Sequence, residues 1–290
     1  MSFNIIVLAK QVPDTRNVGK DAMKADGTVN RAALPAIFNP EDLNALEQAL
    51  QIKDSYPGTK ITILTMGPGR AAEVIREGLY RGADDGVLLT DRAFAGADTL
   101  ATSYALSMAA SKISNFDIII SGRQAIDGDT AQVGPQVAEK LGIPQVTYAE
   151  IIESIEDRKI QIKRRLENGV ETVSVTLPIL ITVNGSAKTC RPRNAKLLQK
   201  YKHAKTITER QIENIDYIDI YSERPYLNLT EWGVADVDAD IALCGLSGSP
   251  TKVKRIENVS FQAKENKRLS DNDDDINELM KELIDNHTIG

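Results

Sequence analysis

Two aspartates and several amide and hydroxyl side chains lie within the stretch SGRQAIDGDTAQVGPQVAEKLG, residues 121–142. The stretch directly follows FDIII, an apolar run typical of a buried strand. Ionised carboxylates only accept hydrogen bonds, so Asp127 and Asp129 suit ribose hydroxyls, adenine N–H groups or helix-terminus amides. Thr130 and Gln132 add donors. A helix N-cap needs only one such residue, so the surplus predicts a ligand-binding loop.

Two further polar clusters follow predicted strands, and each has a purely structural alternative. The glycines of TMGPGR, residues 65–70, permit a close backbone approach to a ligand, but a tight strand-to-helix turn needs them equally. Asp98, Thr99 and Thr102 stand at a helix start, where capping alone explains two of the three. Lys10 is either a phosphate contact or a solvated residue at a strand end.

The sequence contains no recognisable catalytic constellation. Its only histidines are His203 and His287, and Cys190 has no neighbouring base in sequence. A metal site at Asp127 and Asp129 lacks a nearby third carboxylate or histidine. A G-x-S-x-G elbow and a P-loop lysine motif are also missing. These observations favour a nucleotide binder whose chemistry belongs to a cofactor.

Strand-like and helix-like segments alternate through the first half of the chain. The apolar runs typical of strands are residues 4–10, 59–67, 85–91 and 116–122. The segments with helical periodicity are residues 39–55, 71–82, 96–113 and 134–142, the first with Asn39 as N-cap and Pro40 at the first helical position. This order predicts an α/β fold with a doubly wound, mostly parallel, Rossmann-like sheet. Ligands of such sheets bind at the carboxyl ends of the strands.

The pattern changes after Pro144. Residues 146–177 alternate like an antiparallel hairpin with a turn at Asn168-Gly169, and residues 177–183 form an apolar run that rejoins the sheet. We therefore predict a nucleotide-binding core over 1–185, followed by a partner-recognition loop and an extended, partner-wrapping tail over 186–290. In this tail, residues 194–205 and INELMKELIDN are expected to be helical, whereas TERQIENI and SERPYLNLTEWGV resemble surface excursions.

Composition narrows the functional classes further. The 290 residues carry a net charge of −6, with 41 acidic and 35 basic side chains, which argues against a nucleic-acid partner. Two distant cysteines suggest neither a metal site nor a disulfide framework. The N-terminus has no signal-peptide pattern, and no apolar run is long enough for membrane insertion. A cytoplasmic location is expected.

Five stretches together resemble the beta subunit of electron transfer flavoprotein, in order from residue 4 to about residue 200. They are IIVLAKQVPD, FNPEDLNALEQAL, LTMGPG, SGRQAIDGDTAQVGPQVAEKLGIP and VETVSVTLPILITV. The resemblance implies a heterodimer with an alpha subunit that carries the electron-transferring FAD. It also implies docking to acyl-CoA or other dehydrogenases and an adenine nucleotide held by the beta subunit. The expected nucleotide contacts are Leu8, Ala9, Asn39, Pro40, Glu41, Asp42, Met66, Gly67, Asp98, Thr99, Thr102, Gln124, Ala125, Ile126, Asp127, Gly128, Asp129, Thr130, Ala131, Gln132, Val133 and Gly134.

The resemblance leaves the identity of that nucleotide open between AMP and a second FAD. Ordinary members hold structural AMP, whereas AIDGDTAQVGP and GADTLATS look like the electron-bifurcating branch, in which NADH reduces a second FAD. A stand-alone, stress-type adenine-nucleotide binder is the remaining alternative. The family's partner-recognition loop falls on residues 183–205, with an anchoring leucine at Leu197 or its neighbour Leu198 and with Arg193 and Ala195 beside it.

Overall fold

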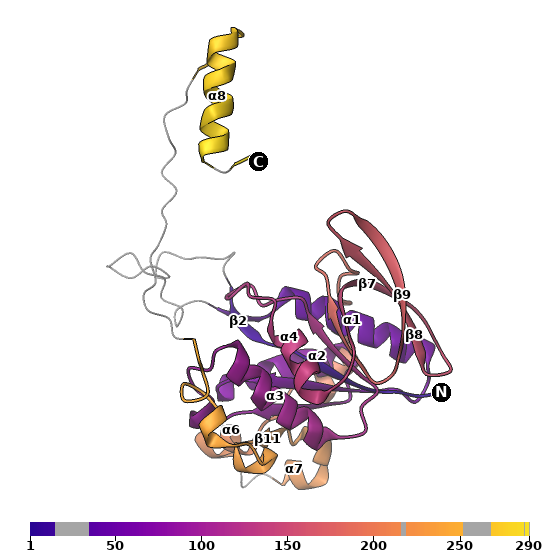
Figure 1. Cartoon of the computed structure of the whole chain (residues 1–290). Coiled ribbons are helices and arrows are strands. Elements are labelled where there is room, and N and C mark those ends of the chain that lie inside the picture. The colour runs from indigo at the N-terminus through magenta and orange to yellow at the C-terminus, as the bar shows by residue number, and fades with distance from the viewer. Residues whose placement is uncertain (15–34, 216–218, 252–267, 287, 290) are drawn as a thin grey trace. The chain divides into compact units, whose positions relative to one another are not determined.

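A computed structural model describes most of the chain, and it comprises two compact units, Met1–Val253 and Lys254–Gly290 (Figure 1). The described residues are 1–14, 35–215, 219–251, 268–286 and 288–289.

The first unit is built around a nine-stranded sheet with the strand order β11-β5-β4-β1-β6-β10-β7-β8-β9. Pairing is parallel from β11 to β7 and antiparallel among β7, β8 and β9. The strands are β1 (Asn4–Leu8), β4 (Lys60–Met66), β5 (Asp85–Leu89), β6 (Ile118–Gly122), β7 (Gln145–Glu156), β8 (Lys159–Leu166), β9 (Gly169–Thr176), β10 (Ile179–Val183) and β11 (Thr230–Trp232). A separate antiparallel pair joins β2 (Gln11–Pro13) to β3 (Ala36–Phe38).

Helices cover both faces of this sheet, which confirms the doubly wound α/β prediction. The first pair is α1 (Pro40–Ser55) and α2 (Ala72–Arg81), and the second is α3 (Thr99–Ile113) and α4 (Val133–Leu141). The central strands are apolar on both faces, because each is buried between two helix layers. In β1, Ile5 and Val7 pack in the core under the first pair, whereas Ile6 and Leu8 pack under the second.

The predicted hairpin and the return of the chain to the sheet are both present. β10 pairs in parallel with β6, and β8 and β9 extend the sheet beyond β7 (Figure 1). The register pairs Leu166 with Gly169, so the turn consists of Glu167 and Asn168, one residue earlier than predicted.

The described residues 186–251 pack onto the core rather than extending from it. They contain α5 (Ala195–Tyr201), α6 (Ile207–Ile212), α7 (Ile220–Glu223) and β11. Tyr201 and Leu227 join the core under α1 and α2, and Val237 joins the core on the opposite face. The first compact unit therefore runs to Val253.

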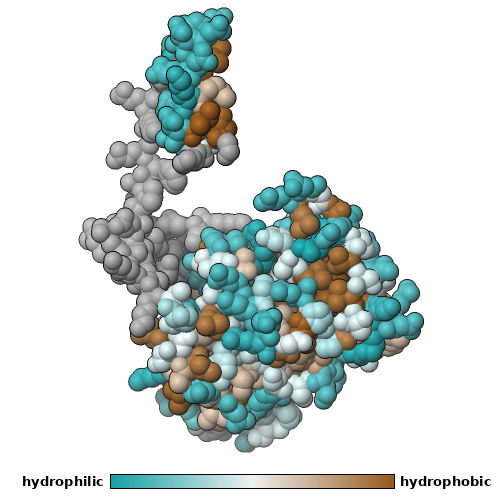
Figure 2. All heavy atoms as spheres, in the orientation of Figure 1, coloured by the Kyte–Doolittle hydropathy of each residue, from teal (hydrophilic) through white to brown (hydrophobic). Residues whose placement is uncertain are grey.

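The second unit contains α8 (Asp273–Asp285), which begins with three aspartates, as the helix dipole favours. It buries none of its residues, and its apolar side chains recur at helical spacing along one side, where Figure 2 shows them as brown atoms. These side chains are Ile276, Leu279, Met280, Leu283 and Ile284. Among the described residues, none of the helices has the length and apolar character that crossing a membrane requires.

Candidate nucleotide site

A cavity of about 940 Å³ lies where the strand order reverses, between β1 and β6. The chain adds β4 and β5 on one side of β1 and then returns to place β6 on the other side. The connections that follow β1 and β6 therefore run in opposite directions, which leaves a crevice at the carboxyl ends of these two strands. Residues after β1, β4, β5 and β6 all line the cavity. Its floor is apolar, with Leu8, Leu64, Met66 and Leu106.

Asp42 joins the two strands on either side of this crevice. Its carboxylate accepts hydrogen bonds from the backbone amides of Lys10, after β1, and Gly122, at the end of β6, both at 2.9 Å. A Cβ at Gly122 would lie 2.5 Å from an Asp42 oxygen, so only glycine permits this contact. Burial raises the pKa of Asp42 to about 7, although both amides favour its ionised form.

The neighbouring residues of the α1 start support the loop that follows β6. Asn39 occupies the N-cap position without a side-chain cap hydrogen bond, contrary to the prediction that it caps α1. Its amide group instead donates to the Gln124 carbonyl at 2.9 Å and accepts from the Ile126 amide at 3.2 Å. Glu41 accepts from the Arg123 guanidinium at 2.9 Å and from the Gln124 amide at 3.1 Å.

The loop itself adopts a costly backbone conformation. Asp129 and Ala131 have φ values of 50° and 52°, in the left-handed region that most side chains avoid. The Gln124 side chain donates to Asp129 at 2.9 Å. Such strain concentrates at binding sites, where surrounding contacts maintain it. A Cβ at Gly134 would lie 2.8 Å from Thr182 and 3.0 Å from Ser121, so glycine allows α4 to approach the sheet closely.

The N-terminus of α4 borders the cavity, and its N-cap residue Gln132 makes no side-chain cap hydrogen bond. Gln132 instead accepts a hydrogen bond from the Thr99 hydroxyl at 3.0 Å. An uncapped helix start presents free amides and a partial positive charge, which suit a phosphate. The start of α3 differs, because Asp98 accepts hydrogen bonds from the Leu100 and Ala101 amides, both at 3.0 Å.

Cations and an unpartnered hydroxyl also line the cavity. Lys10 pairs with Asp127 at 2.7 Å, and Arg123 pairs with Glu41. No hydrogen bond or ion pair holds the exposed Arg92 guanidinium within the described segments. The Ser121 hydroxyl is buried without a hydrogen-bond partner in the same segments. A ligand with anionic oxygens fits these groups.

Most of the predicted contact residues line this one cavity. They are Leu8, Ala9, Asp42, Met66, Gly67, Asp98, Thr99, Thr102, Gln124, Ala125, Gly128, Asp129, Thr130, Ala131, Gln132, Val133 and Gly134. The remaining five do not line it and are Asn39, Pro40, Glu41, Ile126 and Asp127. Arg92 and Thr251, which the sequence did not single out, also line it, as does Ser121, which lies in the predicted loop but not among the expected contacts. In the described part of the chain, no group of three metal-binding side chains occurs.

The segment that contains the predicted partner-recognition residues is tied to α1 and α2 by ion pairs. Arg191 binds the buried Glu47 carboxylate at 3.0 Å, and Arg193 binds Glu77. Although burial opposes ionisation, the Arg191 contacts hold the pKa of Glu47 below its usual value. Within α5, Leu197 packs against the core and Leu198 is 36% exposed.

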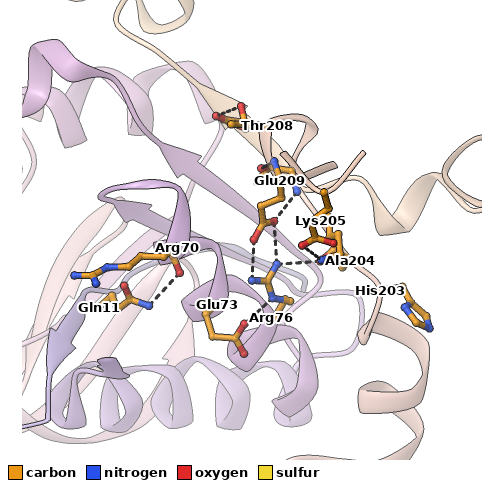
Figure 3. A network of polar contacts seen from close by, with 12 residues as sticks. Gln11, Arg70, Glu73, Arg76, His203, Ala204, Lys205, Thr208 and Glu209 are labelled. Carbon is orange, nitrogen blue, oxygen red and sulfur yellow. Dashed lines mark hydrogen bonds and ion pairs between the residues drawn. The ribbon is translucent and has the colours of Figure 1, made fainter. Parts of the chain in front are cut away.

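A second set of polar contacts anchors the chain after α5 (Figure 3). The Arg76 guanidinium, on α2, donates to both Glu209 oxygens at 3.0 Å and to the Ala204 carbonyl at 3.0 Å. Glu209 also completes a capping box with Thr206 at the start of α6. These contacts fix residues 204–209 against the core.

The fold and the cavity define a doubly wound α/β protein with a large cavity at the topological switch point, where ligands of such sheets bind. The model of the electron transfer flavoprotein domain matches residues 26–210. The chain belongs to the electron transfer flavoprotein family, among its beta subunits.

Three curated relatives illustrate this membership. The chain is 44% identical over 253 residues, 87% of each chain, to an electron transfer flavoprotein subunit beta of Clostridium acetobutylicum. It is 43% identical over 253 residues, again 87% of each, to the caffeyl-CoA reductase-Etf complex subunit CarD of Acetobacterium woodii. It is 54% identical over 182 residues, 62% of this chain and 67% of the relative, to the acryloyl-CoA reductase electron transfer subunit gamma of Anaerotignum propionicum.

Proposed function

We propose that this chain is the beta subunit of a heterodimeric, electron-bifurcating flavoprotein and holds FAD, rather than AMP, in the cavity at the switch point. The observation that carries the proposal is the extent of the cavity, which reaches from the end of β5 to the end of β6. Three interstrand spacings separate these strands, or about 14 Å. The volume of 940 Å³ lies near the top of the range for small-molecule sites, about 300–1,000 Å³. A dinucleotide uses this extent better than a mononucleotide does.

The polar groups that line the cavity near the end of β6 are suited to binding a phosphate of the nucleotide. The α4 start offers amides and dipole, and the Ser121 hydroxyl offers a buried hydrogen-bonding group. Asp129 orders the loop and offers an acceptor for ribose hydroxyls. Bound FAD would supply the redox chemistry, accepting electrons from NADH in the bifurcating form. The residues of this chain bind and orient the cofactor and exclude water from it.

We assign partner contacts to the alpha subunit and to acyl-CoA-type dehydrogenases or reductases. Two relatives support this assignment, since CarD is a subunit of a caffeyl-CoA reductase-Etf complex and the Anaerotignum propionicum relative is an electron transfer subunit of acryloyl-CoA reductase. The recognition residues are Arg193, Ala195, Leu197 and Leu198. Of the two leucines, Leu198 is the more exposed and therefore the better anchor for a partner. The basic residues around α5 would steer an acidic partner.

Nucleotide analysis of the purified heterodimer tests the proposal. After denaturation, chromatography should recover two FAD per heterodimer and no AMP. One FAD with one AMP would contradict the proposal and favour an ordinary member with structural AMP. A colourless chain that is isolated alone and binds ATP would favour the stress-type alternative.

A further inference from the structure

Residues 244–251 run along the segment that precedes α3, and we call them the strap. The Leu246 amide donates to the Ala95 carbonyl at 3.1 Å. The Asp98 amide donates to the Ser249 hydroxyl at 2.8 Å. The amide and hydroxyl of Thr251 both donate to one Asp98 carboxylate oxygen, at 3.0 and 2.6 Å. Two segments about 150 residues apart in sequence are thus joined at the start of α3.

The strap is closely fitted and contributes to the core. Cys244 and Ser249 are buried, and Cys244 packs with the core on the α3 side of the sheet. Gly245 has a φ of 52°, and a Cβ there would lie 2.1 Å from the Ala93 carbonyl oxygen. The strap is therefore a tightly packed part of the first unit, and its residue Thr251 lines the cavity.

The strap also controls the cap of α3. One Asp98 oxygen accepts the amides of the first α3 turn, and the other accepts both Thr251 donors. Burial opposes ionisation of Asp98, but the hydrogen bonds from Thr251 and from the helix amides hold its pKa below the usual value. With both oxygens occupied, Asp98 positions Thr99 and Thr102, which line the cavity, rather than meeting a ligand directly.

We propose that the strap determines which nucleotide the cavity selects: by fixing the first turn of α3, Ser249 and Thr251 favour a dinucleotide over a mononucleotide. This inference rests on the proposed function. Asp98, Thr99 and Thr251 line the cavity together with residues that follow β5, whereas the uncapped α4 start adjoins the residues that follow β6. The two helix starts meet where the Thr99 hydroxyl donates to Gln132, and from there the cavity continues along the residues that follow β5. A mononucleotide held at α4 does not need that continuation, but a dinucleotide does.

The test compares Thr251→Val with Thr208→Val in the full-length chain. Thr208 is a matched control, because its amide and hydroxyl also both donate to one carboxylate, that of Glu231, and it does not line the cavity. Nucleotide-free protein is titrated calorimetrically with FAD and, separately, with AMP. Thr251→Val should weaken FAD binding about tenfold, which corresponds to the loss of about one hydrogen bond to a charged group. AMP binding should change less than about twofold, and Thr208→Val should change neither.

Equal weakening of FAD and AMP, or no weakening at all, would overturn the strap's role while leaving the proposed function standing. A wild-type chain that binds AMP but no FAD would overturn the proposed function itself and the inference with it. Hydrogen exchange on the wild-type chain provides a second measurement that requires no variant. Binding of FAD should slow exchange at the Leu246 and Thr251 amides, and AMP should not. The same protection by both nucleotides would contradict the inference.

Discussion

The charge of Asp42 depends on the fold. Its carboxylate is buried between β1 and β6, and its pKa rises from 3.8 to about 7. Between these two values the native state holds a proton that the unfolded chain has released. Stability from this group is therefore present at low pH and is lost as pH rises toward 7. Glu41 on the same helix adds to the rise, whereas the Lys10 and Gly122 amides and the Asn39 side chain oppose it. Lys10, Arg123, Asp127 and Asp129 are the other charged groups of the adjoining loops.

Asp42→Asn should remove this pH dependence. The amide keeps one acceptor oxygen, so the variant loses some stability at every pH, and the slope is the informative quantity. Between pH 4 and 7 the free energy of unfolding of the wild type should fall relative to the variant, by at most about 4 kcal/mol. Urea unfolding at several pH values measures this difference. Parallel curves for the two proteins would contradict the prediction.

Asp129 and Asp157 permit a controlled test of the cavity loop. Both have left-handed backbones, with φ values of 50° and 46°, but Asp157 lies in the β7–β8 turn. Replacing either with alanine adds the same conformational cost, about 1 kcal/mol. Asp129→Ala should also lower nucleotide occupancy, and the melting temperature should fall with it by mass action. Asp157→Ala should keep full occupancy. Equal occupancy in the two variants would exclude Asp129 from the site.

At the scale of elements, the buried parallel strands were predictable. A strand that is buried on both faces consists of consecutive apolar residues, and such runs stand out between the helical segments of the sequence. β11 was not predictable, since only three residues pair with β5 and TEW has no strand pattern. In the cavity loop, the surplus of polar side chains marked a segment that lines the cavity. Asn39 shows what the sequence could not predict. An asparagine that caps a helix, one that contacts a ligand and one that holds a loop by hydrogen bonds look alike in sequence. Thr251 reaches the cavity only through tertiary packing.

The contacts between α2 and residues 204–209 predict a local contribution to stability (Figure 3). Arg76→Ala removes four hydrogen bonds, three to residues 204–209 and one to Glu73, and leaves Glu209 without its cation, so unfolding should become easier by about 3 kcal/mol. The fluorescence of Trp232, the only tryptophan, reports on β11 during denaturation.

Arg70→Ala is the matched control, because the exposed Arg70 side chain makes no hydrogen bond or ion pair within the described residues, and its backbone carbonyl, which accepts from the Gln11 side chain, is kept in the variant. This control should change stability by less than about 0.5 kcal/mol. Equal stability of the two variants would show that the Arg76 contacts contribute nothing measurable.

At the scale of the whole molecule, the two units differ in what they can do alone. Met1–Val253 contains both hydrophobic cores and the cavity. In the second unit, α8 exposes an apolar stripe, with acidic residues over the rest of its surface. A helix of this kind gains stability by covering an apolar surface. We propose that the apolar stripe of α8 binds an apolar surface of the alpha subunit, as expected of a partner-wrapping tail.

Truncation after Val253 separates the two roles. The shortened chain should keep its nucleotide affinity and its melting temperature, because the cavity and the strap are complete before the cut. Its affinity for the alpha subunit should fall at least about tenfold, or about 1.4 kcal/mol. Met280→Glu places a charge in the apolar stripe and should reproduce much of this loss, whereas Lys281→Glu on the polar side should not. Affinity measured by titrating alpha subunit into each variant decides the matter. Unchanged binding after truncation would show that the C-terminal unit takes no part in assembly, and loss of nucleotide would show that the first unit depends on it.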